Sequence, residues 1–287
     1  MAKPIMIQGT ASGVGKTTIA TALCRIFAQD GYKVSPFKSQ NITTNTAFTK
    51  DGGEIAVSQF LQAYAAKTEP DVNMNPVILK MSPEKKGTQV ILNGKYYDTA
   101  NAYNFKEIKK NLLPEIMKAY DFLSERYDII VVEGAGSPVE LNLIKNGGDI
   151  VNMGIAKRVS APVLLVADID RGGGFASLYG TVNLFDESER GYVKATVVNR
   201  FKGDISSFKD GAEILEEITK VPVAGVVPYI KFDIPEEDTL YNNANSIYNV
   251  DGNNGNFDGQ FDLVADNVRK SLNMELVYKI IDDGVLK

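Results

Sequence analysis

A glycine-rich loop that carries a lysine and two threonines is the segment of this sequence best suited to chemistry. It reads Gly9-Thr-Ala-Ser-Gly-Val-Gly-Lys-Thr-Thr18. Glycines at positions 13 and 15 allow tight turns in which successive backbone N–H groups can point at phosphate oxygens. A helix that begins near Lys16 would add the positive end of its dipole. The residues expected to cradle a nucleotide are Ser12, Gly13, Val14, Gly15, Lys16, Thr17 and Thr18.

Within this loop, Lys16 is expected to reach the β- and γ-phosphates of ATP, and the Thr17 hydroxyl is expected to ligate Mg²⁺. The spacing is one residue longer than that of a standard P-loop, because the first glycine stands at position 9 and Thr10 follows it. A glycine-rich turn with an incidental lysine is the competing interpretation. The apolar run before the loop and the helical pattern after it favour the phosphate site.

Two glutamates are candidates for the carboxylate that a bound metal ion needs. Glu133 stands directly after the apolar run 129–132, so it should lie at the sheet edge where the phosphate loop also opens. Glu54 is expected to begin a helix after Asp51-Gly-Gly53, either as a metal ligand or as an acid of the first helical turn. The residues alone leave these two roles of Glu54 open.

Polar residues also follow two later apolar runs. Asn199 comes after the run 193–198, and its amide offers the donor and the acceptor that the edge of a purine ring requires. Turn formation would explain an asparagine there equally well. Asp168 and Asp170 follow another run, and the glycine-rich turn that begins at Arg171 either holds an anionic group or forms an ordinary loop.

The absence of certain residue types limits the chemistry. The 287 residues include no histidine, which excludes histidine-based acid–base catalysis, Ser-His-Asp triads and histidine-ligated zinc. The single cysteine, Cys24, excludes disulfide frameworks and cysteine-cluster metal sites, and its apolar helical neighbours indicate a buried residue. The chemistry must therefore use carboxylates, lysines, hydroxyls, backbone amides and a hard metal ion.

Charge and hydropathy favour a soluble protein. The net charge is −5 and no basic block occurs, which argues against nucleic acid as the main partner. No signal-like segment or long uncharged apolar run is present, so we expect a cytoplasmic location and no contact with a membrane.

Short apolar runs that alternate with helical patterns must position these residues. Strands are predicted at 4–8, 33–37, 127–132, 162–167, 193–198 and 222–227. Helices are predicted at 16–30, 54–66, 106–126, 149–158, 173–186 and 207–219. Several runs are continuous rather than alternating, which indicates strands covered on both faces. The sequence therefore predicts an α/β fold with a doubly wound, mostly parallel sheet and ligands at the carboxyl ends of its strands.

Two segments interrupt this alternation. Residues 68–105, with one short strand at 89–92, are interpreted as an excursion over the sheet edge that recognises a substrate, or as a structural insertion. Residues 241–260 are rich in Asn and Gly, which indicates a flexible linker, and a terminal helix is predicted at 261–281. We therefore divide the chain into a P-loop domain (1–240), a linker (241–260) and a C-terminal helix segment (261–287).

A series of motifs occurs in a fixed order along roughly residues 4–240. They are Gly9-Thr, Val14-Gly-Lys-Thr17, Lys38-Ser-Gln-Asn41, Asp51-Gly-Gly-Glu54, Asn73-Met-Asn-Pro76, Glu133-Gly-Ala-Gly-Ser-Pro138, Asp149-Ile-Val-Asn-Met-Gly154, Ala167-Asp-Ile-Asp-Arg-Gly-Gly173, Phe175-Ala-Ser-Leu-Tyr-Gly180 and Val226-Val-Pro-Tyr229. In this order and spacing the chain resembles the synthetase part of the cobyric acid synthase family, within the wider dethiobiotin synthetase-like group of P-loop proteins.

The resemblance implies ATP-dependent amidation of carboxylates on a corrinoid ring, from cobyrinic acid a,c-diamide to cobyric acid. ATP and Mg²⁺ would convert a carboxylate to an acyl phosphate, which ammonia then displaces. The implied metal ligands are Thr17, Glu54 and Glu133. The implied catalytic residues are Lys16 and Lys38, which would bracket the transferring phosphoryl group, and Glu133. Asn199 is implied to bind adenine, and Pro228 is implied to be a further nucleotide-binding residue. The residues implied to bind the substrate are Gln40, Asn41, Asp51, Lys80, Ser137 and Arg171.

The chain departs from the family in its source of ammonia. Full-length members carry a glutaminase domain with a cysteine nucleophile and a histidine base, whereas this chain has no histidine and only Cys24. Residues 261–272 resemble the extreme C-terminus of full-length members. We therefore expect this chain to use free ammonia or a separate glutaminase subunit, and whether it forms a homodimer is left open.

Three other functions are weighed against amidation of a corrinoid. A dethiobiotin synthetase-like ligase would act on a smaller carboxylate or amine, but the segments 38–54 and 73–80 favour the corrinoid family. A nucleotide-switch ATPase of the partitioning type usually carries a lysine where this chain has Ala11. A non-catalytic ATP-binding partner is disfavoured by the presence of both Lys16 and Glu133.

Overall fold

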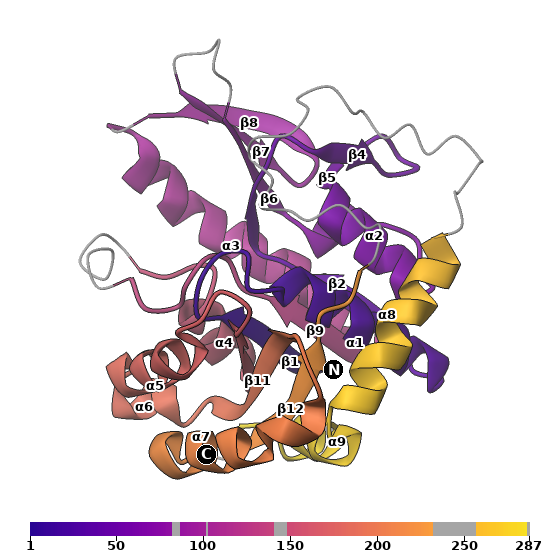
Figure 1. The fold of residues 1–287 in the computed structure, drawn as a ribbon. Helices are drawn as coiled ribbons and strands as arrows, with labels where there is room; N and C mark the ends of the chain where they lie inside the picture. Colours follow the sequence, from indigo (N-terminus) through magenta and orange to yellow (C-terminus); the bar gives the residue numbers. More distant parts are fainter. Residues whose placement is uncertain (82–86, 102, 141–147, 232–256, 286–287) are drawn as a thin grey trace.

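Six parallel strands form the central sheet of the protein, which a computed structural model describes over residues 1–81, 87–101, 103–140, 148–231 and 257–285 (Figure 1). The strand order is β12-β11-β10-β1-β9-β2, and every neighbouring pair is parallel. The strands are β1 (Lys3–Gly9), β2 (Val34–Phe37), β9 (Ile129–Glu133), β10 (Val163–Asp168), β11 (Val193–Phe201) and β12 (Val223–Pro228). All six strand predictions and the doubly wound α/β fold are confirmed.

Helices cover both faces of this sheet, as the continuous apolar strands require. They are α1 (Lys16–Gln29), α2 (Val57–Ala65), α3 (Phe105–Ser124), α4 (Met153–Val159), α5 (Gly174–Leu184), α6 (Glu187–Arg190) and α7 (Lys209–Thr219), with 3₁₀ turns at Val72–Met74 and Ile205–Phe208. In Figure 1, α4, α5 and α6 lie on one side of the central strands and α1 on the other. No helix within the described ranges is long and apolar enough to cross a membrane.

Two helices, α2 and α4, begin three or four residues later than predicted, and in each case a local hydrogen-bond pattern is the reason. Glu54 does not open α2, because it lies in the short strand β5 (Glu54–Ala56), which pairs antiparallel with β4 (Thr46–Phe48). The α4 helix begins at Met153 rather than at 149, because the Asp149 carboxylate accepts hydrogen bonds from the backbone N–H groups of residues 151, 152 and 154. Such a carboxylate turn competes with the helix at its start.

A second sheet of four strands stands beside the central one, where the sequence indicated a single short strand. Its order is β3-β6-β7-β8, with β3 and β6 parallel and the other pairs antiparallel. The strands are β3 (Gln40–Ile42), β6 (Val77–Met81), β7 (Thr88–Leu92) and β8 (Lys95–Ala100). The β3 strand has three residues, too few to show a period, and its partner β6 lies far along the chain. Only tertiary pairing reveals such a strand.

The C-terminal part forms two helices instead of the single helix predicted at 261–281. They are α8 (Phe257–Ser271) and α9 (Met274–Asp283). Leu272 forms a bridge with Gly225 of β12, and the Asn273 side chain caps α9 by accepting from the Leu276 N–H at 3.0 Å. Residues 241–256 of the predicted linker lie outside the described residues. Its last four positions, 257–260, belong to α8.

Helix α8 packs along α1, the helix that follows the phosphate loop (Figure 1). The Arg25 side chain, 5% exposed, lies 2.7 Å from Asp262 and 3.0 Å from Asp258 on α8. At the other end of the contact, Arg269 pairs with Asp30 at 2.9 Å. These contacts place the C-terminal helices against the same body as the phosphate loop.

Candidate nucleotide and substrate site

The register of the central sheet brings three sequence motifs to one edge. Phe37 pairs with Val132, so Lys38 and Glu133 follow on neighbouring strands, and Ile7 pairs with Glu133 on the other side. The phosphate loop leaves β1 between β9 and β10, where the strand order reverses. Ligands of doubly wound sheets bind at such a reversal.

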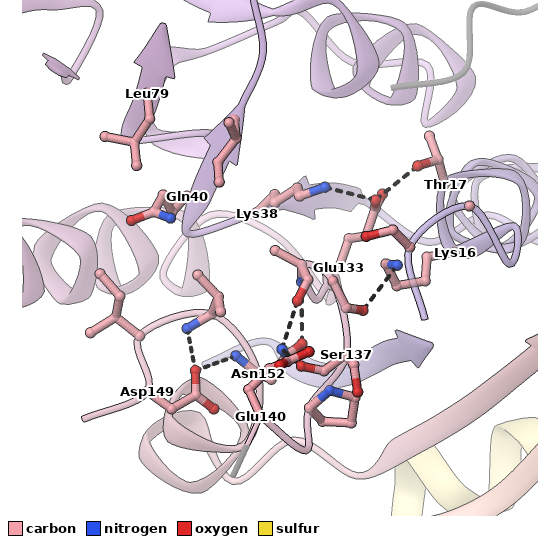
Figure 2. A pocket seen from close by; sticks show the side chains of 18 of the residues that line it. Lys16, Thr17, Lys38, Gln40, Leu79, Glu133, Ser137, Glu140, Asp149 and Asn152 are labelled. Carbon is pink, nitrogen blue, oxygen red and sulfur yellow. Dashed lines mark hydrogen bonds and ion pairs between the residues drawn. The ribbon is translucent and has the colours of Figure 1, made fainter. Parts of the chain in front are cut away.

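A cavity of about 610 Å³ opens at this edge (Figure 2). This volume lies in the range of small-molecule sites. Its walls come from the phosphate loop, from the ends of β2 and β9, from the loops that follow β9, and from the second sheet. The lining residues that the sequence predicted are Ser12, Gly13, Gly15, Lys16, Thr17, Thr18, Lys38, Gln40, Glu133 and Ser137.

Lys16 connects two loops of the cavity wall. Its Nζ donates to the carbonyl oxygens of Ala11, at 3.1 Å, and of Gly136, at 3.2 Å. Gly15 directly before it has φ +97°, and a Cβ there would lie 2.0 Å from Asn199 Nδ2. Glycine is therefore required at position 15 both by the backbone conformation and by the lack of space.

Glu133 is the centre of the buried polar contacts in this site. Its Oε1 accepts from Thr17 Oγ1 at 2.9 Å and from Lys38 Nζ at 3.0 Å, and its Oε2 accepts from Gln62 Nε2 at 2.7 Å. Burial by itself disfavours the charge, but the Lys38 ammonium group and these hydrogen bonds outweigh it and lower the pKa of Glu133 below its usual range. The carboxylate is therefore ionised at neutral pH.

The backbone of Lys38 is held by a residue whose role the sequence did not reveal. Asn75, fully buried, donates its amide to the Lys38 carbonyl oxygen at 2.8 Å, and the Lys38 N–H donates to the Met74 carbonyl oxygen at 2.8 Å. Both contacts come from the motif Asn73-Met-Asn-Pro76. The motif thus fixes the strand end from which Lys38 reaches Glu133.

Glu54 lies apart from the other two residues expected to hold the metal. Its carboxylate pairs with Lys80 and accepts from Thr46 Oγ1 at 2.6 Å, and Glu54 does not belong to the cavity lining. Thr17 and Glu133 do meet there. Within the described residues no group of three or more acidic or cysteine side chains is clustered in a way that would hold a metal ion.

Asn199 and Pro228, the two later residues expected to bind the nucleotide, differ in their distance from the phosphate loop along the sheet. Asn199 is 3% exposed and donates to the Val14 carbonyl oxygen at 2.9 Å, so it supports the loop from below. Pro228 ends β12, and the strands β11 and β10 lie between β12 and β1. Neither residue lines the cavity, so contact of Asn199 with adenine and of Pro228 with the nucleotide stays a prediction.

Of the six residues expected to bind the substrate, two line the cavity and four do not. Gln40 and Ser137 line the cavity. Asn41 is fully buried beneath its wall, and Lys80 is paired with Glu54. Asp51 and Arg171 are exposed and do not line the cavity.

Two further residues of the cavity wall became apparent only in the fold. Asn152 donates to the carbonyl oxygens of Ala135 and Ser137, at 2.7 and 3.1 Å, and so fixes the loop after Glu133 (Figure 2). Arg200 lines the cavity, pairs with Asp168 at 3.0 Å, and has φ +61°, an uncommon backbone conformation for an arginine. A single arginine after a predicted strand does not indicate, from the sequence alone, that it lines a cavity.

A parallel α/β sheet with a glycine-rich loop, a lysine and a buried glutamate around one cavity defines a P-loop nucleotide-binding protein. Residues 5–239 match the sequence family described as the CobQ/CobB/MinD/ParA nucleotide binding domain, and the chain belongs to this family.

Among curated proteins, the chain is similar to two cobyric acid synthases. It is 55% identical over 240 residues to that of Ruminiclostridium cellulolyticum, covering 84% of this chain and 46% of the relative. It is 52% identical over 240 residues to that of Streptococcus sanguinis, covering 84% and 48%. The chain thus spans about half the length of these relatives. Among solved structures, chloroplast FtsY from Physcomitrella patens aligns with a TM-score of 0.47 and 16% identity, over 82% of this chain and 60% of that one.

Proposed function

We propose that the cavity is the site of an ATP-dependent synthetase that amidates carboxylates of a corrinoid, converting cobyrinic acid a,c-diamide to cobyric acid. The observation that carries this proposal is the meeting of Lys16, Lys38 and Glu133 around one cavity that continues along the second sheet. The similarity to cobyric acid synthases supports the choice of substrate.

The residues of the cavity suit activation of a carboxylate by phosphoryl transfer. A carboxylate oxygen of the substrate would attack the γ-phosphorus of ATP, the bond to ADP would break, and an acyl phosphate would form. Such a transfer depends on positioning and on neutralising the charge of the phosphoryl oxygens. Lys16 and Lys38 supply two cationic groups to the cavity lining, and the N–H groups of the phosphate loop supply oriented dipoles.

Two oxygen donors of the site fit Mg²⁺. Thr17 Oγ1 and the Glu133 carboxylate lie 2.9 Å apart in the cavity lining, and Mg²⁺ on nucleotides usually takes one or two protein oxygens besides phosphates and water. The ion would neutralise phosphate charge when bound. A role of Glu54 as a further ligand stays a prediction, since its carboxylate is paired with Lys80.

Ammonia completes the reaction by attacking the acyl carbon, with phosphate as the leaving group and the loss of one proton to give the amide. Cys24 is fully buried, and burial together with the nearby charge of Glu133 raises the pKa of its thiol, so it is not a nucleophile for glutamine. We therefore propose that ammonia reaches this site free or from a separate glutaminase subunit.

An assay with ¹⁵N-labelled ammonium tests the proposal. The protein is incubated with ATP, Mg²⁺, the labelled ammonium salt and cobyrinic acid a,c-diamide, while ADP release and ¹⁵N in the corrinoid are followed by mass spectrometry. We expect one ADP for each amide formed with ammonium, and no amide with glutamine alone. ADP release without ¹⁵N in the corrinoid, at pH values where part of the ammonium is deprotonated, would contradict the proposal.

Replacement of Lys16 by alanine provides the variant for this assay. Removing a cationic group that acts on the transferring phosphoryl should lower turnover by roughly 10²–10³-fold, the usual loss for one such electrostatic contact. Lys118→Ala is the matched control, because Lys118 is 74% exposed and pairs with Glu115 on its own helix. Both variants should melt near the wild-type temperature, and a Lys16→Ala variant that melts normally and keeps its activity would refute the assigned role.

A further inference from the structure

A row of buried side-chain amides leads from the second sheet to Glu133 across helix α2. Gln62 Nε2 donates to Glu133 Oε2 at 2.7 Å, Gln59 Nε2 donates to Gln62 Oε1 at 3.3 Å, and Asn41 Nδ2 donates to Gln59 Oε1 at 2.8 Å. Gln62 is 1% exposed, and Gln59 and Asn41 are fully buried. The three amides thus form one connected path that ends at the carboxylate.

The charge of Glu133 dictates the orientation of every amide in this row. An ionised carboxylate only accepts hydrogen bonds, so Gln62 must present its NH₂ group and turn its oxygen toward Gln59. Gln59 must then present its NH₂ group, and its oxygen receives the amide of Asn41 and, at 2.9 Å, the hydroxyl of Ser58. All three amide dipoles therefore point their positive ends toward the carboxylate.

The two oxygens of Glu133 are divided between two sets of partners. Gln62 occupies Oε2, whereas Thr17 and Lys38, which line the cavity, both reach Oε1. A carboxylate held in this way cannot rotate without breaking the contact with Gln62. The hydrogen bond from Gln62 to Oε2 therefore fixes Oε1 as the carboxylate oxygen of Glu133 that faces the phosphate loop.

Apolar side chains would fill the same space at a lower cost in desolvation free energy. Packing alone therefore does not explain why amides occupy it. Burying a polar group costs free energy unless the group is hydrogen-bonded. Gln59 and Gln62 stand three positions apart, on one face of α2, while Phe60, Leu61 and Ala63 of the same helix are buried in the core. One face of an otherwise apolar helix is thus reserved for the path to Glu133.

We propose that Gln62 is a positioning residue for Glu133, held in place by Gln59 and Asn41, and that it sets the orientation of the carboxylate toward Mg²⁺ and nucleotide. Asn41 stands between Gln40 and Ile42, which both line the cavity, so the path begins at a wall of the cavity. The assignment rests on the proposed function only in taking Glu133 to serve the bound metal and nucleotide.

The first test compares ADP binding by Gln62→Met with that of the wild type, with and without Mg²⁺, by calorimetry. Methionine keeps the length of the side chain but donates no hydrogen bond. We expect about tenfold weaker binding of ADP with Mg²⁺, the effect of about one lost hydrogen bond to a charged group, and unchanged binding without Mg²⁺. Gln29→Met is the matched control, since Gln29 donates to Asp262 at 2.8 Å on an exposed part of α1 and should leave both affinities unchanged.

The second test uses Gln62→Glu, which can donate only when it is protonated. Two buried carboxyl groups in contact share a proton, and the pKa of that shared proton is raised. At low pH the protonated Glu at position 62 replaces the amide, so Mg²⁺-dependent ADP binding should approach that of the wild type. It should weaken as the pH rises through the raised pKa, a trend that the wild type does not show.

The melting temperature of Gln62→Glu separates this proposal from the proposed function. Because its shared proton has a raised pKa in the folded state, the stabilising contribution of this proton should be present at low pH and be lost as the pH rises through the raised pKa, whether or not Glu133 serves a nucleotide. One outcome is a melting temperature of Gln62→Glu that falls with rising pH while Glu133→Gln leaves Mg²⁺-dependent ADP binding unchanged. In that case the role proposed for Glu133 in nucleotide binding is wrong, and its contact with Gln62 is confirmed. Equal ADP affinities of Gln62→Met and wild type with Mg²⁺, or a Gln62→Glu variant whose binding and melting have the wild-type pH dependence, would overturn the positioning role.

Discussion

At the residue scale, burial and pairing act in opposite directions on Glu133. The side chain is 1% exposed, which by itself would favour the protonated acid, yet it lies 3.0 Å from Lys38 and accepts from Thr17 and Gln62. The pKa of Glu133 is lowered, so the effect of Lys38 and of the hydrogen bonds exceeds the effect of burial. Glu133 in turn compensates the positive charge of Lys38, which is 3% exposed.

The lowered pKa of Glu133 predicts how stability depends on pH. A carboxyl group with a lowered folded-state pKa stabilises the protein fully above its unfolded-state pKa of about 4.3, and the contribution is lost as the pH falls below that value through the folded-state pKa. The difference in free energy of unfolding between wild type and Glu133→Gln should therefore be constant from pH 5 to 7. It should shrink in more acidic buffer, as measured by urea unfolding. A difference that grows on acidification would contradict the lowered pKa.

At the element scale, close backbone approach explains why the C-terminal helices dock where they do. Gly225 of β12 bridges Leu272, the first of the two residues between α8 and α9, and a Cβ at position 225 would lie 2.1 Å from the Ser271 carbonyl oxygen. The sequence shows a helical pattern in this region, but it does not reveal the break at residues 272–273, because Leu272 continues the apolar period. The break depends on β12, a distant element.

Substitution of Gly225 by alanine tests this contact. The overlapping atoms belong to the backbone and cannot move cheaply, so we expect a loss of about 1–3 kcal/mol in the free energy of unfolding, the usual cost of overpacking. Gly180→Ala is the control, since Gly180 lies in α5 with open space around its Cβ position. Alanine there should be neutral or stabilising by up to about 1 kcal/mol, because glycine is the poorer helix former. Chemical unfolding of both variants provides the measurement, and equal stability of the two would refute the close contact.

At the scale of the whole molecule, the cavity joins the central sheet to the second sheet, whose strands lie between β2 and β9 in the sequence. The phosphate loop and Glu133 belong to the central sheet, whereas Gln40, Ile42, Leu79 and Met81 come from the second sheet. A ligand that fills the cavity would therefore contact both parts at once. A ligand that binds only the folded state stabilises that state. Binding in the cavity should therefore raise the free energy of unfolding of the whole chain.

Binding of ATP with Mg²⁺ should stabilise the whole chain. At a hundredfold excess over Kd the expected gain is about 2.7 kcal/mol in the free energy of unfolding. Thermal unfolding at increasing ATP concentration measures it, and the shift should disappear in Lys16→Ala. A shift of equal size in that variant would show that the nucleotide binds elsewhere.

The sequence by itself determined the central sheet, the phosphate loop and the place of Glu133 at the edge where that loop opens. Continuous apolar runs and glycine spacing are local properties, and the carboxyl ends of parallel strands share an edge. Only the tertiary structure decided that Glu54 pairs with Lys80, that Asn199 supports the loop, and that Gln62 reaches Glu133. Those contacts join residues that are far apart in the chain, and neither period nor motif encodes which buried amide or carboxylate a given partner will meet.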